Sequence, residues 1–154
     1  EESRGHAAPY GHWDTGRPRF DVEDGHSADR PALRRVSSPT ELNPVFLSAL
    51  CDSSMLDAAE DLIGPNIRFH HSKLNLKLPG SATKVQWHQD FCFDPHTNDD
   101  VLVLVLFLDD QCTDNGPLEV APGSHRGPLQ SLWHDGVFTG SMAPAAAAAN
   151  AKIA

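Results

Sequence analysis

Basic runs, cysteine pairs and long apolar stretches are all scarce in this chain of 154 residues. The formal net charge is −9 and no run of lysine and arginine is present, which argues against nucleic acid or an anionic membrane as partner. The longest apolar run, residues 101–108, is far too short to cross a bilayer as a helix, because a helical span needs roughly 20 residues. No charged segment followed by an apolar one opens the chain at Glu1, so we expect neither a signal peptide nor a membrane span.

Cysteine occurs three times, at Cys51, Cys92 and Cys112, and never as Cys-x-x-Cys. An odd number without that spacing fits reduced thiols better than a disulfide framework. We therefore expect an intracellular, cytoplasmic setting. The same spacing argues against a structural zinc site built from cysteines.

The length and the hydrophobic content of 40% allow one ordinary globular domain. Residues 1–40 are rich in Gly, Pro, Ser, Asp and Arg and lack sustained periodicity, so we expect a polar, loop-rich N-terminal segment. The remaining residues, 41–154, are expected to form the domain.

Two short helices are predicted at the start of this domain. Asn43 followed by Pro44 is a good N-cap and first helical position. A second helix is expected to begin at Ser53 or Ser54 and to end at Gly64, which is followed by proline.

Beyond the helices the hydrophobic period changes to two. Leu74, Leu76 and Leu78 alternate with Lys73, Asn75 and Lys77, which predicts a strand with one polar face. We expect a bulge near residues 70–72 and turns at 79–81, 115–116 and 122–124. Further strands are expected at 83–87, at 118–122 and, buried on both faces, at 101–108. Two helices followed by short strands indicate an α+β fold, mainly β, with a sandwich or barrel core.

The motif that carries chemistry is Trp87-His88-Gln89-Asp90. In extended backbone, residues i and i+2 point the same way, so His88 and Asp90 would present an imidazole and a carboxylate to one side. These are two of the three ligands in the facial triad of non-haem Fe(II) oxygenases. Gln89 would point to the other face and serve a structural role.

The stretches 73–90 and 109–127 resemble the phytanoyl-CoA dioxygenase family, and the resemblance covers residues 40–140. It rests on Lys-Leu-Pro-Gly-Ser followed by Trp-His-Gln-Asp, and on Asn-Gly-x-Leu-x-Val-x-Pro-Gly-Ser-His. The family implies a double-stranded β-helix (a cupin-like jelly roll) that uses Fe(II), 2-oxoglutarate and O2. It would hydroxylate a small organic substrate and convert 2-oxoglutarate to succinate and CO2. By this resemblance His88 and Asp90 bind iron, and the strand carrying Asn75 and Lys77 lines the cosubstrate pocket.

The chain departs from the family pattern in one respect. The family places a third iron ligand, a histidine, well downstream and an arginine for 2-oxoglutarate shortly after it. Neither pattern appears before Ala154. We therefore expect an incomplete jelly roll, C-terminally truncated relative to the family and inactive alone. His125 and His134 are the candidate substitutes upstream of the end, and the family does not use the histidine of Pro-Gly-Ser-His as a ligand.

Two alternatives remain open from the sequence. The first is a non-catalytic or degenerate jelly-roll module that binds without turnover. The second is a cupin-type isomerase or hydrolase that uses another metal through His88, Asp90 and His125. The sequence leaves the substrate and the oligomeric state undetermined.

Overall fold

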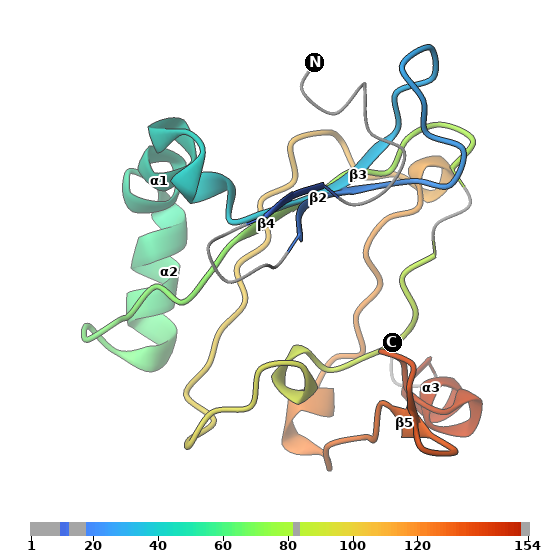
Figure 1. The fold of residues 1–154 in the computed structure, drawn as a ribbon. Coiled ribbons are helices and arrows are strands. Elements are labelled where there is room, and N and C mark those ends of the chain that lie inside the picture. Colours follow the sequence, from blue (N-terminus) through green and yellow to red (C-terminus); the bar gives the residue numbers. More distant parts are fainter. Residues whose placement is uncertain (1–9, 13–17, 82–83, 152–154) are drawn as a thin grey trace. The chain divides into compact units, whose positions relative to one another are not determined.

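The computed structural model describes residues 10–12, 18–81 and 84–151 (Figure 1). The contacts within the chain divide it into two units, which are described in turn. The first unit comprises Glu1–Thr83 and Leu102–Leu108. The second comprises Lys84–Val101 and Asp109–Ala154.

The first unit contains a four-stranded antiparallel sheet in the order β1-β2-β3-β4. Its strands are β1 (Tyr10–His12), β2 (Pro18–Val22), β3 (Leu33–Ser37) and β4 (Lys73–Asn75). Phe20 of β2 lies opposite Val36 of β3, which lies opposite Leu74 of β4. These side chains, with Val22 and Leu33, form a small apolar cluster on one face of the sheet.

The prediction that residues 1–40 are loop is therefore wrong for β1, β2 and β3, and strands precede the two helices. The apolar alternation in β2 and β3 is too short to be recognised in the sequence. These strands are stabilised by pairing in sequence order and by the distant β4. Residues 1–9 and 13–17 of the predicted segment lie outside the described residues.

A bulge interrupts the pairing of β2 with β3. This is not the bulge that we predicted from the sequence, which was placed near residues 70–72. Asp21 pairs with Arg35 and Val22 with Leu33, so Arg34 is the extra residue. A bulge re-aims side chains. Here it allows Arg34 and Arg35, adjacent in sequence, to contact the same carboxylate, that of Asp21.

The two helices follow as predicted, after a short 3-10 turn, η2 (Pro39–Glu41). The helix α1 (Pro44–Cys51) begins at its cap Asn43, whose Oδ1 accepts a hydrogen bond of 3.0 Å from the amide of Val45. The helix α2 (Ser54–Ile63) begins at Ser53 and ends at Gly64, which has a φ of 90°. Both helices lie to one side of the sheet (Figure 1).

The alternation around β4 is confirmed. Leu74, Leu76 and Leu78 are partly buried, while Lys73, Asn75 and Lys77 are exposed. The turns at 79–81, 115–116 and 122–124 are also present.

Three other strand predictions are wrong. Residues 84–87 and 118–122 have no strand assignment, and Thr83 lies outside the described residues. The apolar run 101–108 is not a strand either, and Val103 and Leu108 are 53% and 70% exposed. A strand needs a hydrogen-bonded neighbour. Within the described residues, no sheet includes this run.

The second unit is built mainly from turns. It contains three 3-10 helices, η3 (Asp90–Cys92), η4 (Thr113–Asn115) and η5 (Ser124–Arg126), and the helix α3 (Pro144–Ala151). The strands β5 (Trp133–His134) and β6 (Val137–Phe138) form a hairpin. Its two turn residues, Asp135 and Gly136, both have positive φ, as the right-handed twist of a hairpin favours. Among the described residues of this unit, the buried apolar side chains are those of Leu132 and Met142.

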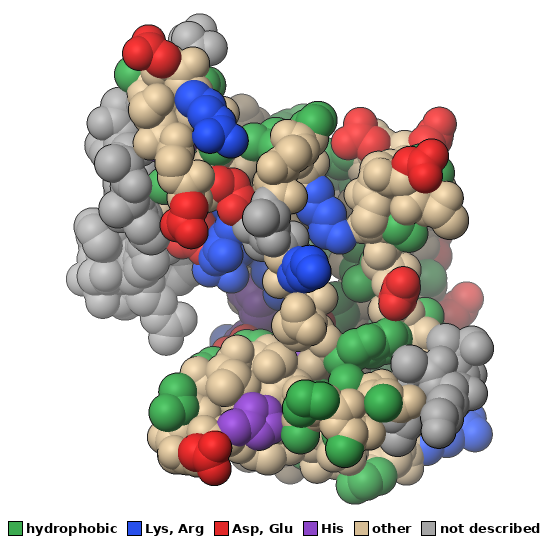
Figure 2. Space-filling model, turned by 90° about the vertical axis from the view of Figure 1, so that its right-hand side faces the viewer, with side chains coloured by type: hydrophobic (Ala, Val, Ile, Leu, Met, Phe, Trp, Pro, Cys, Tyr) green, Lys and Arg blue, Asp and Glu red, His purple; other side chains and the backbone are tan. Residues whose placement is uncertain are grey.

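The described structure is thus α+β, with few helices and small antiparallel sheets. Among the described residues, no helix is long and apolar enough to cross a membrane. Many large apolar side chains are exposed, and Figure 2 shows several of them in green at the surface.

Replacing Phe20 by Ala should destabilise the first unit strongly, because Phe20 is 8% exposed at the centre of its apolar cluster. Phe-to-Ala changes in cores cost about 3–5 kcal/mol. Phe69→Ala is the matched control, since Phe69 is 46% exposed in the same unit and its removal should cost less than about 0.5 kcal/mol. Urea unfolding followed by circular dichroism measures both. Equal losses in the two variants would contradict the assigned core.

Candidate metal and cosubstrate site

His88 and Asp90 are brought together in the second unit. Nε2 of His88 lies 3.2 Å from Oδ1 of Asp90. The segment before Asp90 is extended but unpaired, and Asp90 is the first residue of η3. Gln89 has φ of −114° and ψ of 124°, which is extended backbone. The i and i+2 side chains therefore point the same way even though the predicted strand is absent.

The imidazole of His88 is held by the backbone two residues earlier. Its Nδ1 lies 2.7 Å from the carbonyl oxygen of Gln86. A carbonyl only accepts hydrogen bonds, so Nδ1 carries the proton and the lone pair of the neutral ring is on Nε2. This nitrogen is the one that faces Asp90. Metal-binding histidines commonly have such a partner on the other ring nitrogen, because it fixes the tautomer and the ring plane.

The separation of the two ligand atoms suits a divalent metal ion. First-row metals bind imidazole nitrogen and carboxylate oxygen at about 2.1 Å, so two ligands at right angles lie about 3.0 Å apart. The observed 3.2 Å is close to that value. The side chains of His88 and Asp90 are 24% and 42% exposed, which leaves the pair accessible to an ion from solvent.

Gln89, between the two candidate ligands, has the structural role predicted for it. Its Oε1 accepts a hydrogen bond of 2.8 Å from the amide of Gln130, and its Nε2 donates to the carbonyl of Pro128 at 3.4 Å. The thiol of Cys92 also donates to the carbonyl of Gln130. The segment 128–130 is thus tied to the backbone that carries His88 and Asp90.

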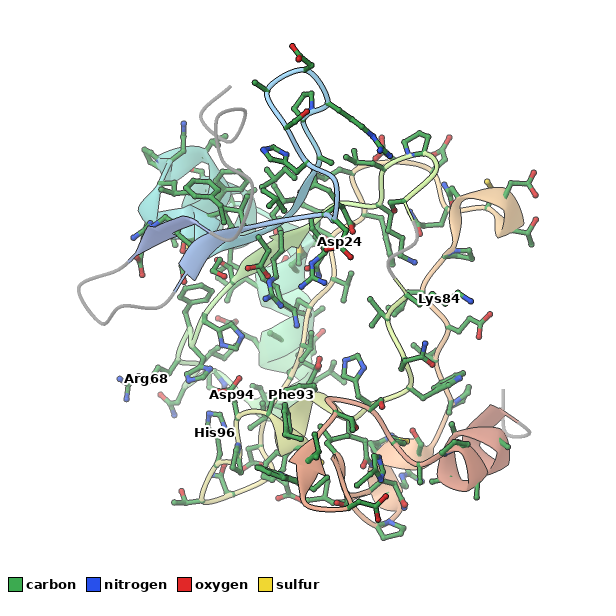
Figure 3. All side chains as sticks on the ribbon, turned by 45° about the vertical axis from the view of Figure 1, so that its right-hand side comes forward. Asp24, Arg68, Lys84, Phe93, Asp94 and His96 are labelled. Atoms are coloured by element: carbon green, nitrogen blue, oxygen red, sulfur yellow. The ribbon has the colours of Figure 1, made fainter. Side chains whose placement is uncertain are left out.

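Aromatic side chains line one side of the His88 ring. The ring of Phe93 meets it edge to face, with centroids 5.4 Å apart. Phe93 packs in turn on Phe138, which packs on Trp133. Phe93 and His96 lie in the stretch that follows η3 (Figure 3), and Nδ1 of His96 is engaged by the carbonyl of Asp94 at 2.6 Å. Phe93 therefore restricts the ring of His88, while His96 closes its own turn.

No third ligand joins His88 and Asp90 within residues 19–81 and 84–148, whose side chains are described. There, no group of three or more His, Cys, Asp or Glu side chains could hold a metal ion. Nε2 of His134 is 2.8 Å from the carbonyl oxygen of Ser141, and His125 is exposed on η5. These positions weigh against the isomerase or hydrolase alternative, which required His125.

Asn75 and Lys77, the residues predicted to contact the cosubstrate, belong to the first unit. Both are exposed on the polar side of β4 and its continuation. Asn75 pairs directly with Arg35 of β3. The backbone pairing continues past β4, because the amide of Leu76 donates to the carbonyl of Arg34 at 2.9 Å.

Two sets of contacts in the structure were not predicted from the sequence. The carbonyl of Gln86 carries no signal in the sequence, because every residue has one. Asp21, Arg34 and Arg35 could have been noticed as charges in a short alternating stretch, but only the bulge reveals that they contact one another.

Comparison with known proteins shows which family this chain belongs to. A sequence model described as "Phytanoyl-CoA dioxygenase (PhyH)" matches residues 15–141. The chain is 39% identical to a Stutzerimonas stutzeri protein named "Probable alpha-ketoglutarate-dependent hypophosphite dioxygenase", over 86% of this chain and 44% of that protein. It is 31% identical to "L-proline trans-4-hydroxylase" of Streptomyces griseoviridis, over 78% and 45%.

An "Ectoine dioxygenase" of Sphingopyxis alaskensis is 34% identical, over 61% of this chain and 32% of that protein. The chain thus spans less than half the length of these three curated relatives. No solved structure matches it.

The contact with Gln86 predicts the tautomer of His88. In the neutral ring the proton should be on Nδ1, whereas isolated histidine side chains carry it on either nitrogen. Nitrogen-15 NMR of the side chain at pH 8 measures this directly. His125, exposed and lacking such a described carbonyl contact, is the internal control. A neutral His88 that is protonated on Nε2 would contradict the site geometry.

Proposed function

This chain belongs to the phytanoyl-CoA dioxygenase (PhyH) family, and from that premise we propose that it is part of an Fe(II)- and 2-oxoglutarate-dependent dioxygenase. The proposed reaction hydroxylates a small substrate with O2 while 2-oxoglutarate is converted to succinate and CO2. The observation that carries the proposal is the 3.2 Å approach of His88 Nε2 to Asp90 Oδ1.

His88 and Asp90 are the proposed iron ligands. Neutral imidazole and a carboxylate suit Fe(II), and this pair leaves positions for a third protein ligand, 2-oxoglutarate and O2. Iron, when bound, supplies the redox chemistry of the reaction. The chain's own part is to orient the ligands. The carbonyl of Gln86 fixes the ring of His88, and Gln89 fixes the backbone between the two ligands.

Asn75 and Lys77 are proposed to bind 2-oxoglutarate. An amide N–H and an ammonium group both donate to carboxylates, and the ammonium adds a favourable charge. Both side chains are exposed in the structure, so a ligand can reach them.

The substrate is proposed to be a small polar molecule. The names of the three relatives mention hypophosphite, L-proline and ectoine, which are all of this kind. A panel of small polar molecules that includes these three compounds tests the proposal, because fold and family do not fix a substrate.

A non-catalytic module remains the second candidate. The observation that favours it is that no third ligand accompanies His88 and Asp90 among the described residues. A chain with two ligands is expected to bind iron more weakly than a complete triad.

We also propose that residues 41–154 contribute a partial double-stranded β-helix, and that residues 1–40 are an appended polar segment. The many charged and turn-forming residues in 1–40 support this division. The segment attaches to the domain through its strands β2 and β3, because β3 pairs with β4.

Limited proteolysis should cut first within the exposed turn at residues 27–31. First cuts at residues 44–63 would contradict the division.

The longer protein that contains this chain should form succinate only when Fe(II), 2-oxoglutarate and a substrate are all supplied. His88→Ala and Asp90→Ala should each lower the rate roughly 100-fold or more, because each removes a ligand that positions the metal. His125→Ala, at an exposed position outside the site, is the matched control and should retain the rate. Succinate is measured by NMR over a panel of small polar substrates. Turnover that persists in both ligand variants would overturn the assignment.

A further inference from the structure

Two adjacent histidines lie just before β4, in the first unit. In extended backbone, neighbouring side chains point to opposite faces, so the sequence alone predicts that His70 and His71 do not act together. The structure differs, because residues 66–72 are neither helix nor strand. Nδ1 of His70 lies 2.7 Å from Nδ1 of His71. The irregular backbone thus turns the same nitrogen of both rings toward one point.

The contact between the two rings is a meeting of two nitrogen atoms. The ring centroids are 4.7 Å apart and the ring planes are inclined by 74°. In the neutral pair one Nδ1 donates a proton and the other accepts it, and each ring can also carry its proton on Nε2. A metal ion that binds both Nδ1 atoms would replace the shared proton, which then moves to Nε2 of the same ring.

The separation of the two nitrogens indicates which kind of ion fits. Imidazole nitrogen binds first-row metals at about 2.0–2.1 Å, so two nitrogens at a right angle lie about 2.8–3.0 Å apart, and in a tetrahedron about 3.3–3.4 Å apart. The observed 2.7 Å is closer to the right angle. Cu(II) and Ni(II) prefer tetragonal coordination, which has right angles between neighbouring ligands, whereas Zn(II) prefers the tetrahedron.

The backbone directly after the pair is fixed by neighbouring segments. The amide of Ser38 donates to the carbonyl of Ser72 at 2.8 Å. The hydroxyl oxygens of Thr40 and Ser72 lie 3.2 Å apart. The next residue begins β4, which pairs with β3. His71 is therefore joined to a backbone that the sheet already holds, which lowers the entropic cost of ordering the pair around an ion.

Both histidines are exposed, so an ion can reach them from solvent. Among the side chains that the structure describes, no third His, Cys, Asp or Glu completes the pair into a group of three. Water would supply the remaining positions. Two protein ligands and several waters make a site that an ion can both enter and leave.

We propose that His70 and His71 form a metal site of their own, in which their Nδ1 atoms chelate Cu(II) or Ni(II). The site does not depend on the proposed function, because it belongs to the first unit and shares no residue with His88 and Asp90. Affinity for nitrogen ligands rises from Fe(II) through Ni(II) to Cu(II). Two imidazoles therefore select these late ions more strongly than one imidazole and one carboxylate do.

The test is a titration of the metal-free 154-residue chain with NiCl2 at about pH 8, followed by NMR of the histidine rings. The signals of His70 and His71 should broaden or shift together, before that of His125 responds. His70→Ala and His71→Ala should each weaken binding about tenfold or more, because each tethered ligand raises the effective concentration of the other. His125→Ala, which removes an exposed histidine elsewhere, is the matched control and should bind normally.

An equal response of all histidine rings would overturn the site, as would unchanged Ni(II) affinity in both alanine variants of the pair. Tighter binding of Zn(II) than of Ni(II) would overturn the right-angle geometry. The amide of Ser38, bonded to Ser72, reports whether the variants keep this part of the fold.

The outcome is separable from that of the proposed function. His88→Ala should still show the joint response of His70 and His71 to Ni(II), because His88 belongs to the other unit. Loss of that response in His88→Ala would contradict a separate site. If the longer protein lacks iron-dependent turnover while the pair binds Ni(II), the proposed function fails and this site stands.

Discussion

One hydrogen bond, between Nδ1 of His88 and the carbonyl of Gln86, determines what the candidate metal site can do. It fixes the ring plane and, in the neutral ring, holds the proton on Nδ1, so Nε2, the nitrogen that lies 3.2 Å from Asp90, is the atom that can bind a metal ion. Without it, the His-x-Asp spacing would bring two side chains near one another but would not orient a ligand atom. The extended backbone at Gln89 and its hydrogen bonds to segment 128–130 preserve this orientation.

Local partners already present in the chain fix the geometry of the candidate metal site before any ligand arrives. The carbonyl of Gln86 holds the ring of His88, and the hydrogen bond from the amide of Gln130 to Gln89 holds the backbone between His88 and Asp90. Such preorganisation lowers the entropic cost of binding.

The sequence predicted what depends on neighbouring residues. Asn43 and Ser53 cap their helices as expected, Gly64 ends the second helix, and the leucines around β4 alternate in burial. Predictions failed where structure depends on distant partners. The run 101–108 is apolar enough for a buried strand but is in no sheet of the described residues, whereas β2 and β3 gain strand structure from pairing that their composition does not indicate. The His88 and Asp90 pair was predicted, but the bulge that joins Arg34 and Arg35 to Asp21 was not.

The central claim is that His88 and Asp90 form a metal site, and anaerobic titration of this 154-residue chain with Fe(II) tests it most directly. NMR of the His88 and His96 rings follows the binding, with His96 as an internal reference. The account predicts that one equivalent of Fe(II) broadens the His88 ring first, and that Asp90→Ala abolishes this effect. Binding that leaves His88 unaffected, or that is unchanged in Asp90→Ala, would contradict it.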